Sequence, residues 1–457
     1  MRVAFRNVLA GSLMLVGMSS AEAQDKRTRS DLLTELAQAE SSFKSQANDA
    51  TRLTLIRLLY QSGEFWRADT LARPFRESKA PSDSALEIAA RLSFLVGRYE
   101  ESNTLYERLA GMRSGKVQGQ AMARVGQMFA LNQLNAFNRV KALPFPPGVV
   151  LPQVKLMASF GSAPYRIEWT GEKRVAEVEW FTSDPLPQFS IEVNGVPLNV
   201  LYDTGGDILI LDEEVAKALG VVSVASASGK FGGGMVGQFG FGKVELVTVG
   251  AVTIRDVPVM IMPAKRFTFD KRHPLAGIFG TALTRQFLTT LDYKNQKLIL
   301  RERTVENARA IRRELGGDLA AEVPFVLDAT HLMMARGGLN GKSGMTWFMD
   351  SGLAMQAAFT APIQTLQYTG IPVPETKMPE GTVGGGGGKW ASGIFDIKSL
   401  SVGPLQQSNL KGEYGARPPE SYWANGFIVD GLMSHNFLRK YSSWTMDFDS
   451  MTYLFAK

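Results

Sequence analysis

Residues 189–205 read FSIEVNGVPLNVLYDTG, and this stretch carries most of the fold information in the chain. Apolar residues recur on both sides of the Asn-Gly pair at 194–195, a dipeptide typical of a tight hairpin turn. Residues 332–352, LMMARGGLNGKSGMTWFMDSG, repeat the plan with a polar turn at 340–342 and a second apolar run that stops at Asp350. The sequence therefore predicts two β-hairpins, each ending in an Asp-[Thr/Ser]-Gly triplet.

Two such triplets in matching contexts indicate an internal duplication. A chain of 457 residues with average composition would hold roughly 0.2 of them by chance. Further matching segments follow each triplet: Gly277–Gly280 pairs with Gly431–Ser434, and Leu291–Tyr293 pairs with Met446–Phe448. Each copy spans about 110 to 140 residues, a normal size for a small β-rich lobe.

On these motifs, residues 183–457 resemble the pepsin and retropepsin superfamily of aspartyl proteases, in its bacterial single-chain form with two lobes. The resemblance implies an all-β acid-protease fold, with a first lobe over 183–300 and a second lobe over 320–457. It also implies one catalytic aspartate per lobe, at Asp203 and Asp350. The expected substrate is a peptide or protein. A monomer suffices for catalysis, because one chain carries both lobes.

The neighbours of the two aspartates have expected supporting roles. Gly205 and Gly352 let the backbone come close and adopt turns that a Cβ would forbid. The resemblance implies that the hydroxyls of Thr204 and Ser351 brace the opposite loop. Two adjacent carboxylates cannot both ionise at low cost, so the pair keeps one proton. One carboxylate then activates a water and the other hydrogen-bonds the developing oxyanion. Which aspartate has which role stays open, because coupled groups titrate as a pair.

Three residues depart from the family pattern. Gly206 and Leu353 follow the triplets, where the family usually has Ser, Thr or Ala, and Ser434 stands where the segment behind the loop usually ends in Gly. A bulky apolar neighbour would desolvate the carboxylates and raise their pKa values. An alternative hypothesis is therefore a catalytically impaired peptide-binding or scaffold protein that keeps the protease fold and whose helical repeats recruit partners. A third is a latent enzyme whose cleft is covered by the N-terminal helices.

Two glycine-rich stretches are candidate substrate-binding flaps. Residues 229–237 include Phe231 and Gly233, and residues 384–388 are five glycines centred on Gly386. Flaps in the resembling family lie over the cleft. The alternative is a pair of mobile surface loops, since glycine runs are flexible by default.

The amino terminus predicts export. Two arginines precede the apolar stretch 8–16, and residues 21–23, Ala-Glu-Ala, fit the rule for signal-peptidase cleavage. We therefore expect a signal peptide over 1–23, cleavage after Ala23, and a periplasmic or secreted protein. The apolar stretch is too short for a bilayer span, which needs about 18 residues or more, and no later segment reaches that length.

Residues 24–143 predict an all-α domain that resembles tetratricopeptide repeats. Small residues recur at Ala68, Ser102 and Ala136, a spacing of 34 residues, which is the tetratricopeptide period. The expected turns before them are at Gly63, Gly97 and, in a degenerate third copy, Asn132-Gln133. Concave faces of such repeats often bind partner proteins. A protein partner on these helices and a purely structural cap on the protease both remain open.

Two connecting segments and several exclusions complete the prediction. Residues 144–182 are expected to form a proline-rich linker and strands that lead into the first lobe, and the charged segment 301–319 a helix between the lobes. No metal or other cofactor is expected, because the chain has no Cys and its three His residues form no zinc motif. The net charge of +6 is spread along the chain, which gives little support for nucleic-acid binding.

Overall fold

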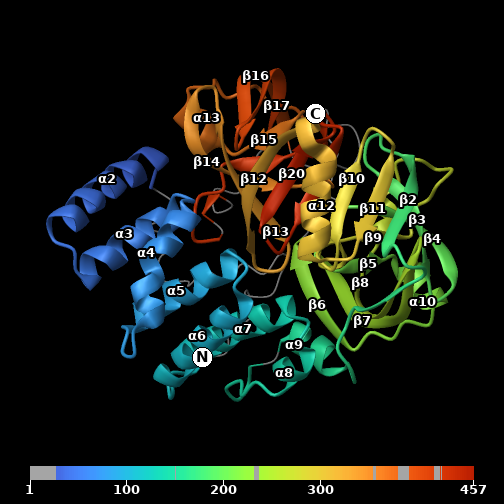
Figure 1. Cartoon of the computed structure of the whole chain (residues 1–457), viewed down its shortest axis with the longest axis horizontal. Helices are drawn as coiled ribbons and strands as arrows, with labels where there is room; N and C mark the ends of the chain where they lie inside the picture. The colour runs from blue at the N-terminus through green and yellow to red at the C-terminus, as the bar shows by residue number, and fades with distance from the viewer. Residues whose placement is uncertain are drawn as a thin grey trace.

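Helices occupy the first third of the described chain and strands dominate the rest (Figure 1). The structure, a computed structural model, describes residues 27–149, 151–230, 236–353, 357–378, 391–415, 422–423 and 425–457. The predicted signal peptide, 1–23, lies outside the described residues. The helical domain comprises α2 (Arg29–Ser45), α3 (Asp49–Gln61), α4 (Phe65–Glu77), α5 (Asp83–Leu95), α6 (Tyr99–Met112), α7 (Val117–Gln133), α8 (Phe137–Lys141) and α9 (Pro152–Ala158).

The hairpins α3–α4, α5–α6 and α7–α8 share one turn geometry. Their turn residues Gly63, Gly97 and Asn135 have φ angles of +83°, +84° and +56°. In each turn the following N–H donates to a carbonyl five residues earlier: Glu64 to Leu59, Arg98 to Ser93 and Ala136 to Leu131. This helix-ending motif requires a left-handed residue, which glycine supplies at least cost and asparagine tolerates.

The third turn was expected at Asn132-Gln133, and that prediction is wrong. Both residues belong to the last turn of α7, which has 17 residues where α5 has 13. The turn therefore falls at Asn135, and Ala136 precedes α8 instead of lying on it. The third hairpin does not keep the 34-residue period. The tetratricopeptide resemblance thus stays a prediction, while the helical character of the domain is a structural fact.

The first lobe is built from strands with short helices. Its elements are β1 (Arg166–Trp169), β2 (Val175–Thr182), β3 (Gln188–Val193), β4 (Val196–Tyr202), β5 (Leu209–Leu211), α10 (Glu213–Ala218), β6 (Ala225–Lys230), β7 (Val236–Val249), β8 (Val252–Ile261), η1 (Ala264–Phe267), β9 (Gly277–Phe279), α11 (Thr281–Thr284), β10 (Leu288–Asp292) and β11 (Lys297–Arg301). The segment 144–182, predicted as a linker with leading strands, also contains α9, which packs against β6 and β7.

The second lobe follows a helix, α12 (Val305–Leu315), that lies within the predicted connecting segment 301–319. Its elements are η2 (Gly316–Asp318), β12 (Leu319–Asp328), β13 (Leu332–Leu339), β14 (Lys342–Met349), β15 (Phe359–Ala361), α13 (Ile363–Thr369), β16 (Ser392–Val402), β17 (Leu405–Gly415), β18 (Gly431–Met433), α14 (His435–Leu438), β19 (Ser443–Asp447) and β20 (Thr452–Ala456).

The two lobes repeat one topology. The β3–β4 hairpin of the first lobe corresponds to β13–β14 of the second. A parallel strand then lies beside the second strand of each hairpin: β9 beside β4, and β18 beside β14. The strand after each triplet pairs antiparallel with this parallel strand: β5 with β9, and β15 with β18. The duplication inferred from the triplets therefore extends to the strand pairings around them.

Six antiparallel strands join the lobes in the order β2-β11-β10-β19-β20-β12. Three come from each lobe, and β10 pairs with β19 at the junction. There Thr290 lies opposite Thr445, with their hydroxyl oxygens 2.8 Å apart. Because this sheet is continuous across the junction, it fixes the orientation of one lobe relative to the other.

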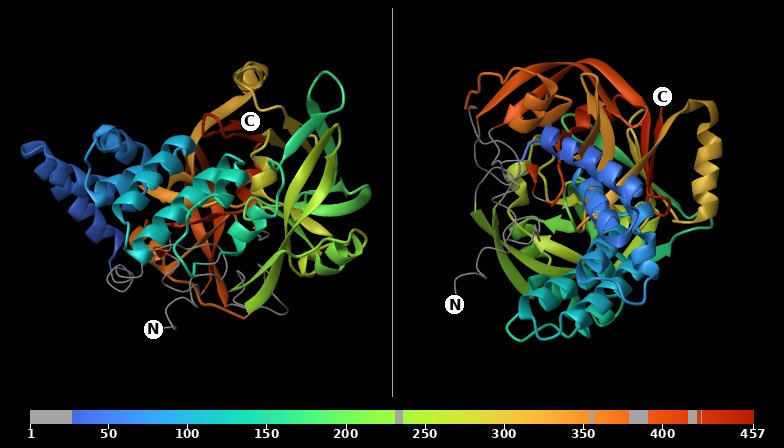
Figure 2. Two further views of the ribbon diagram at one scale, coloured as in Figure 1. Left: turned by 90° about the horizontal axis from the view of Figure 1, so that it is seen from below. Right: turned by 90° about the vertical axis from the view of Figure 1, so that its left-hand side faces the viewer.

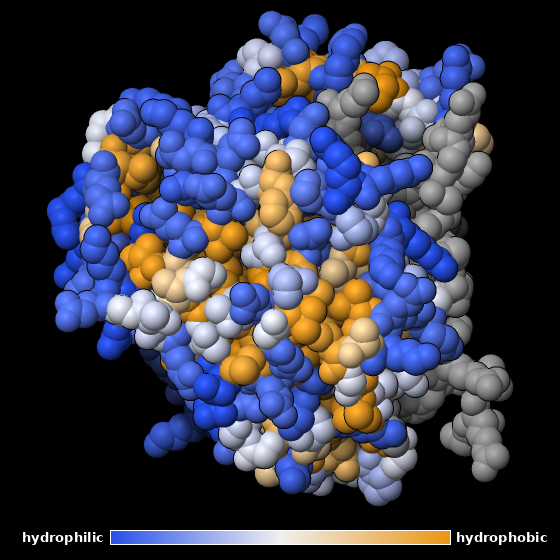
Figure 3. Space-filling view, turned by 90° about the vertical axis from the view of Figure 1, so that its right-hand side faces the viewer, coloured by the Kyte–Doolittle hydropathy of each residue, from blue (hydrophilic) through white to orange (hydrophobic). Residues whose placement is uncertain are grey.

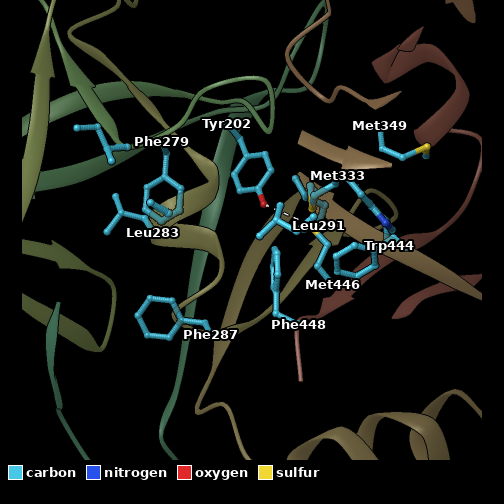
Figure 4. Close-up of a cluster of buried hydrophobic side chains, with 14 of the residues drawn as sticks. Tyr202, Phe279, Leu283, Phe287, Leu291, Met333, Met349, Trp444, Met446 and Phe448 are labelled. Atoms are coloured by element: carbon cyan, nitrogen blue, oxygen red, sulfur yellow. Dashed lines mark hydrogen bonds between the residues drawn. The ribbon is translucent and has the colours of Figure 1, made fainter. Parts of the chain in front are cut away.

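Beneath the junction the two lobes share one apolar core (Figure 4). Tyr202, at the end of β4, stacks on Phe279, and its hydroxyl donates to the sulfur of Met446 at 3.7 Å. Met446 lies on β19 of the second lobe. The residues that precede the two triplets, Tyr202 and Met349, are both fully buried. Each triplet therefore emerges from this common core.

The helical domain forms a layer along one side of both lobes (Figures 1 and 2). Its last helices share the main core with the first lobe, through Phe137, Leu156 and Met157. Its first helices share a second core with the second lobe, where Phe65 packs edge-on against Phe427 at 4.8 Å between ring centres. The helices are thus an integral part of the packed molecule.

Asp328, at the end of β12, is a pH-sensitive residue in this interface. It lines a cavity of about 90 Å³ together with Arg91 and Tyr106. Burial raises the pKa of Asp328 to about 6, although Arg91 opposes the shift. The pKa of Asp328 in the folded protein is above its ordinary value of 3.8, so the folded state favours the protonated form. The contribution of Asp328 to the free energy of unfolding is therefore present in acid and is lost as pH rises through about 6.

Asp328→Asn is therefore expected to raise the free energy of unfolding by about 1–3 kcal/mol at about pH 7.5, and by much less at about pH 4. Urea unfolding of both proteins at the two pH values measures the difference. Asp396→Asn, which removes an exposed carboxylate on β16, is the control and should change neither value. An equal gain from Asp328→Asn at both pH values would contradict the assignment.

Hydrophobic and hydrophilic side chains share the outer surface. On the face seen in Figure 3, apolar patches are divided by hydrophilic residues. Within the described ranges, none of the helices combines the length and the apolar character needed to cross a membrane.

Candidate active site

Each aspartate is held by the strand that passes behind its loop. Asp203 follows β4, and its N–H donates to the Phe279 carbonyl of β9 at 3.1 Å. Asp350 follows β14, and its N–H donates to the Met433 carbonyl of β18 at 3.1 Å. The same backbone hydrogen bond thus fixes the same point of the loop in both lobes.

The two triplets lock onto each other through their hydroxyl residues. The Thr204 N–H donates to Ser351 Oγ at 2.9 Å, and the Ser351 N–H donates to Thr204 Oγ1 at 2.9 Å. Thr204 Oγ1 also donates to the Met349 carbonyl at 2.9 Å. Both side chains are fully buried, where an unpaired hydroxyl would be costly. The bracing role predicted for Thr204 and Ser351 has the geometry that it requires.

This lock brings the two carboxylates together. The Gly205 N–H donates to Asp203 Oδ1 at 2.6 Å, and the Gly352 N–H donates to Asp350 Oδ1 at 3.0 Å. A Cβ placed on Gly205 would lie 3.0 Å from Asp203 Oδ1 and 2.8 Å from Asp350 Oδ1. Both carboxylates therefore border one small volume. A Cβ on Gly352 would collide with the Asp203 carboxylate itself, so residue 352 must be glycine.

Burial sets the electrostatics of the pair. It raises the pKa of Asp203 above the ordinary value, against the opposing effects of the Gly205 N–H, His331 and a side-chain hydrogen bond with Asp350. A carboxyl group in this setting holds its proton to higher pH than an exposed one. The site can therefore keep one proton between two acids.

Asp207, Thr330 and His331 lie next to the pair and were not selected from the sequence. Burial raises the pKa of Asp207, and the nearby His331 and Thr330 oppose the shift. His331 Nδ1 lies 2.9 Å from Thr330 Oγ1. Burial lowers the pKa of His331, although Asp207 and Asp203 both raise it. Asp207 stands four residues after Asp203, and this closeness in sequence could have marked it as a candidate site residue. Nothing in the sequence indicates that residues 330–331 lie beside Asp207.

The departures from the family pattern fit their surroundings. A methyl group on Gly206 would make ordinary contacts of 3.4 Å or more, so the position has room for a small residue. Ser434 is fully buried, donates to the Ala357 carbonyl at 2.6 Å and caps α14 through the Asn436 N–H. Its counterpart, Gly280, has no space for a Cβ, because three carbonyls of residues 206–208 lie within 3.0 Å.

The segments that join the triplets to the next strands differ in length. Leu209 of β5 is six residues beyond Asp203, whereas Phe359 of β15 is nine residues beyond Asp350. Leu353 is half-buried and its N–H approaches the Asp350 carbonyl at 3.4 Å, so it continues the turn of the triplet.

The flap residues predicted from the sequence, Phe231, Gly233 and Gly386, lie outside the described residues. Residues on either side of both stretches are paired. Gly229 pairs with Gly237 on β6 and β7, and an isolated antiparallel bridge joins Lys377 to Ser392. No group of three or more metal-binding side chains gathers anywhere in the described part of the chain.

A comparison with protein families matches one segment of the chain, which lies within the first lobe. Residues 189–297 match the family model described as Aspartyl protease. This span includes Asp203, not Asp350. Among solved structures, a retropepsin-like aspartic protease from Rickettsia conorii is similar at 18% sequence identity, covering 30% of this chain and 94% of that chain, with a TM-score of 0.20. No curated protein matches the chain.

Proposed function

We propose that this protein is an exported aspartic endopeptidase that uses Asp203 and Asp350 as a catalytic pair. The observation that carries the proposal is the reciprocal lock between Thr204 and Ser351, which makes both carboxylates border one volume. A reaction that needs two acids on one water needs that arrangement. The sequence match of residues 189–297 to aspartyl proteases supports the same chemistry.

In the proposed mechanism the pair begins with one proton. The ionised carboxylate accepts a proton from a water as its oxygen attacks the peptide carbonyl, and the protonated carboxyl hydrogen-bonds the oxygen that becomes negative. Collapse of the tetrahedral intermediate breaks the C–N bond, and the leaving amine takes a proton from the pair. The N–H groups of Gly205 and Gly352 orient one oxygen of each carboxylate throughout.

The proposed substrate is an extended peptide held between the lobes. The paired ends of β6 and β7 belong to the candidate flap 229–237, and extended peptides commonly bind by pairing with such strands. Export rests on the amino-terminal sequence alone. The scaffold alternative assigned partner recruitment to the helices, but part of their apolar surface is occupied by Phe427 and neighbouring residues of this same chain.

The proposal predicts bell-shaped pH dependence. Hydrolysis should fall at low pH, where both acids are protonated, and at high pH, where the shared proton is lost; the raised pKa of Asp203 moves the second limb upward. A random peptide library incubated with the purified protein, from about pH 3 to 8, and read by mass spectrometry measures this. Absence of cleavage over the whole range by folded protein would overturn the proposal.

A further inference from the structure

The turn between α7 and α8 contacts both lobes. On one side it meets Arg285 and Gln286, which directly follow α11 of the first lobe. On the other side it meets Ala329 and Thr330, in the turn between β12 and β13 of the second lobe. The first contact directly follows α11, which binds the loop after Asp203. The second contact directly precedes His331, a neighbour of Asp203 and Asp207.

Arg285 makes the first contact by donating hydrogen bonds to the C-terminal end of α7. It donates to the Gln133 carbonyl at 2.6 Å, to the Asn132 carbonyl at 2.8 Å and to Asn135 Oδ1 at 3.0 Å. Only 3% of Arg285 is exposed, and none of the ion pairs formed by the described residues includes it. The carbonyls at a helix C-terminus lack intrahelical partners and carry partial negative charge, so the end of α7 offers acceptors to both terminal nitrogens of this buried cation.

Gln133 makes the second contact. Its side-chain amide donates to the carbonyls of Ala329 and Thr330, at 3.2 Å each. Ala329 has a φ angle of +51°, a left-handed conformation that is unfavourable for a residue with a Cβ. Two hydrogen bonds from one buried amide therefore stabilise this turn.

The two contacts converge on the site loops. The N-terminal end of α11 binds the loop after Asp203: the Thr281 N–H donates to the Gly206 carbonyl at 2.9 Å, and the Ala282 N–H to the Asp207 carbonyl at 2.7 Å. From the other lobe, the turn at 329–331 holds His331, whose Nδ1 lies 2.9 Å from Thr330 Oγ1 and whose ring is close enough to Asp203 and Asp207 to interact with both carboxylates. The α7–α8 turn therefore hydrogen-bonds to both elements that lie beside the Asp203 loop, the end of α11 and the turn at 329–331.

We infer that the α7–α8 turn positions the carboxylate pair, with Gln133 as the positioning residue that ties the second-lobe turn to the Asp203 loop. The effect on hydrolysis rests on the proposed function; the effect on loop order does not. Loss of the Gln133 amide should let the Asp203 loop shift relative to Asp350. Because the Gln133 side chain bonds the Ala329 and Thr330 carbonyls and neither carboxylate, kcat should fall while KM stays constant.

The test is Gln133→Leu in the full chain, which keeps the side-chain size and removes the amide. The matched control is Glu64→Leu. Glu64 also lies in a helical-hairpin turn and also binds the second lobe, through Arg336 of β13, but it does not touch residues 328–331. We expect Gln133→Leu to lower kcat about tenfold at constant KM, and Glu64→Leu to change kcat less than about twofold.

A second readout does not depend on activity. Hydrogen exchange of the backbone N–H groups in residues 202–208 and 349–353 should be about tenfold faster in Gln133→Leu and unchanged in Glu64→Leu. Unchanged exchange in folded Gln133→Leu, or equal effects of the two variants, would overturn the inference. If the unaltered protein cleaves no peptide, the proposed function fails and the exchange result alone decides the positioning role.

Discussion

Asp203→Asn and Asp350→Asn are each expected to lower kcat for peptide hydrolysis by about 10²–10⁴-fold. An amide cannot accept a proton from water, and it cannot share a proton with the remaining carboxylate. The double variant should be little worse than either single variant, because residues that act as one unit give non-additive losses. Initial rates on one peptide chosen from the library, at the pH of maximal activity, measure all three.

Stability measurements separate lost chemistry from lost folding. The pKa of Asp203 is raised by burial, so its stabilising contribution is present in acid and is lost as pH rises through the folded pKa. Asp203→Asn should therefore unfold at an equal or higher urea concentration at neutral pH. The exposed-carboxylate control Asp396→Asn should retain full kcat. A folded Asp203→Asn or Asp350→Asn with unaltered kcat would contradict the catalytic assignment.

The hairpins before the triplets were predictable because their turn chemistry is local. Asn194 and Gly195 have φ angles of +51° and +78°, and Asn340 and Gly341 have +49° and +82°. Both turns need two left-handed residues in succession, and Asn-Gly is the pair that adopts this most readily. The asparagines also bind the next hairpin: Asn194 Oδ1 accepts the Leu246 N–H, and Asn340 Oδ1 accepts the Lys398 N–H.

The parts that escaped prediction depend on contacts between distant residues. Gln133 looked like a degenerate turn residue, but its role comes from residues almost 200 positions later, at Ala329 and Thr330. The same holds for His331, whose neighbours Asp203 and Asp207 belong to the other lobe. Periodicity and turn motifs report local backbone preference, and they contain no information on which surface a helix will cover.

Breaking the ion pair between Arg29 and Asp430 should give the largest loss of stability. Arg29 is the first residue of α2, and Asp430 directly precedes β18, the strand that holds the Asp350 loop. Arg29 donates through Nε and Nη2 to both carboxylate oxygens, and their side chains are 2% and 0% exposed. Arg29→Met leaves a buried carboxylate without its cation, so we expect a loss of about 3–5 kcal/mol in urea unfolding.

The double variant tests whether this loss reflects an unpaired charge. Asp430 also accepts the Thr346 N–H at 2.8 Å, so asparagine at 430 keeps an acceptor there while removing the charge. Arg29→Met with Asp430→Asn should therefore recover much of the stability that Arg29→Met alone loses, because neither partner is left as an isolated buried ion. If the double variant is as unstable as the sum of the single variants, packing of α2 and not charge pairing fixes the helical domain to the second lobe.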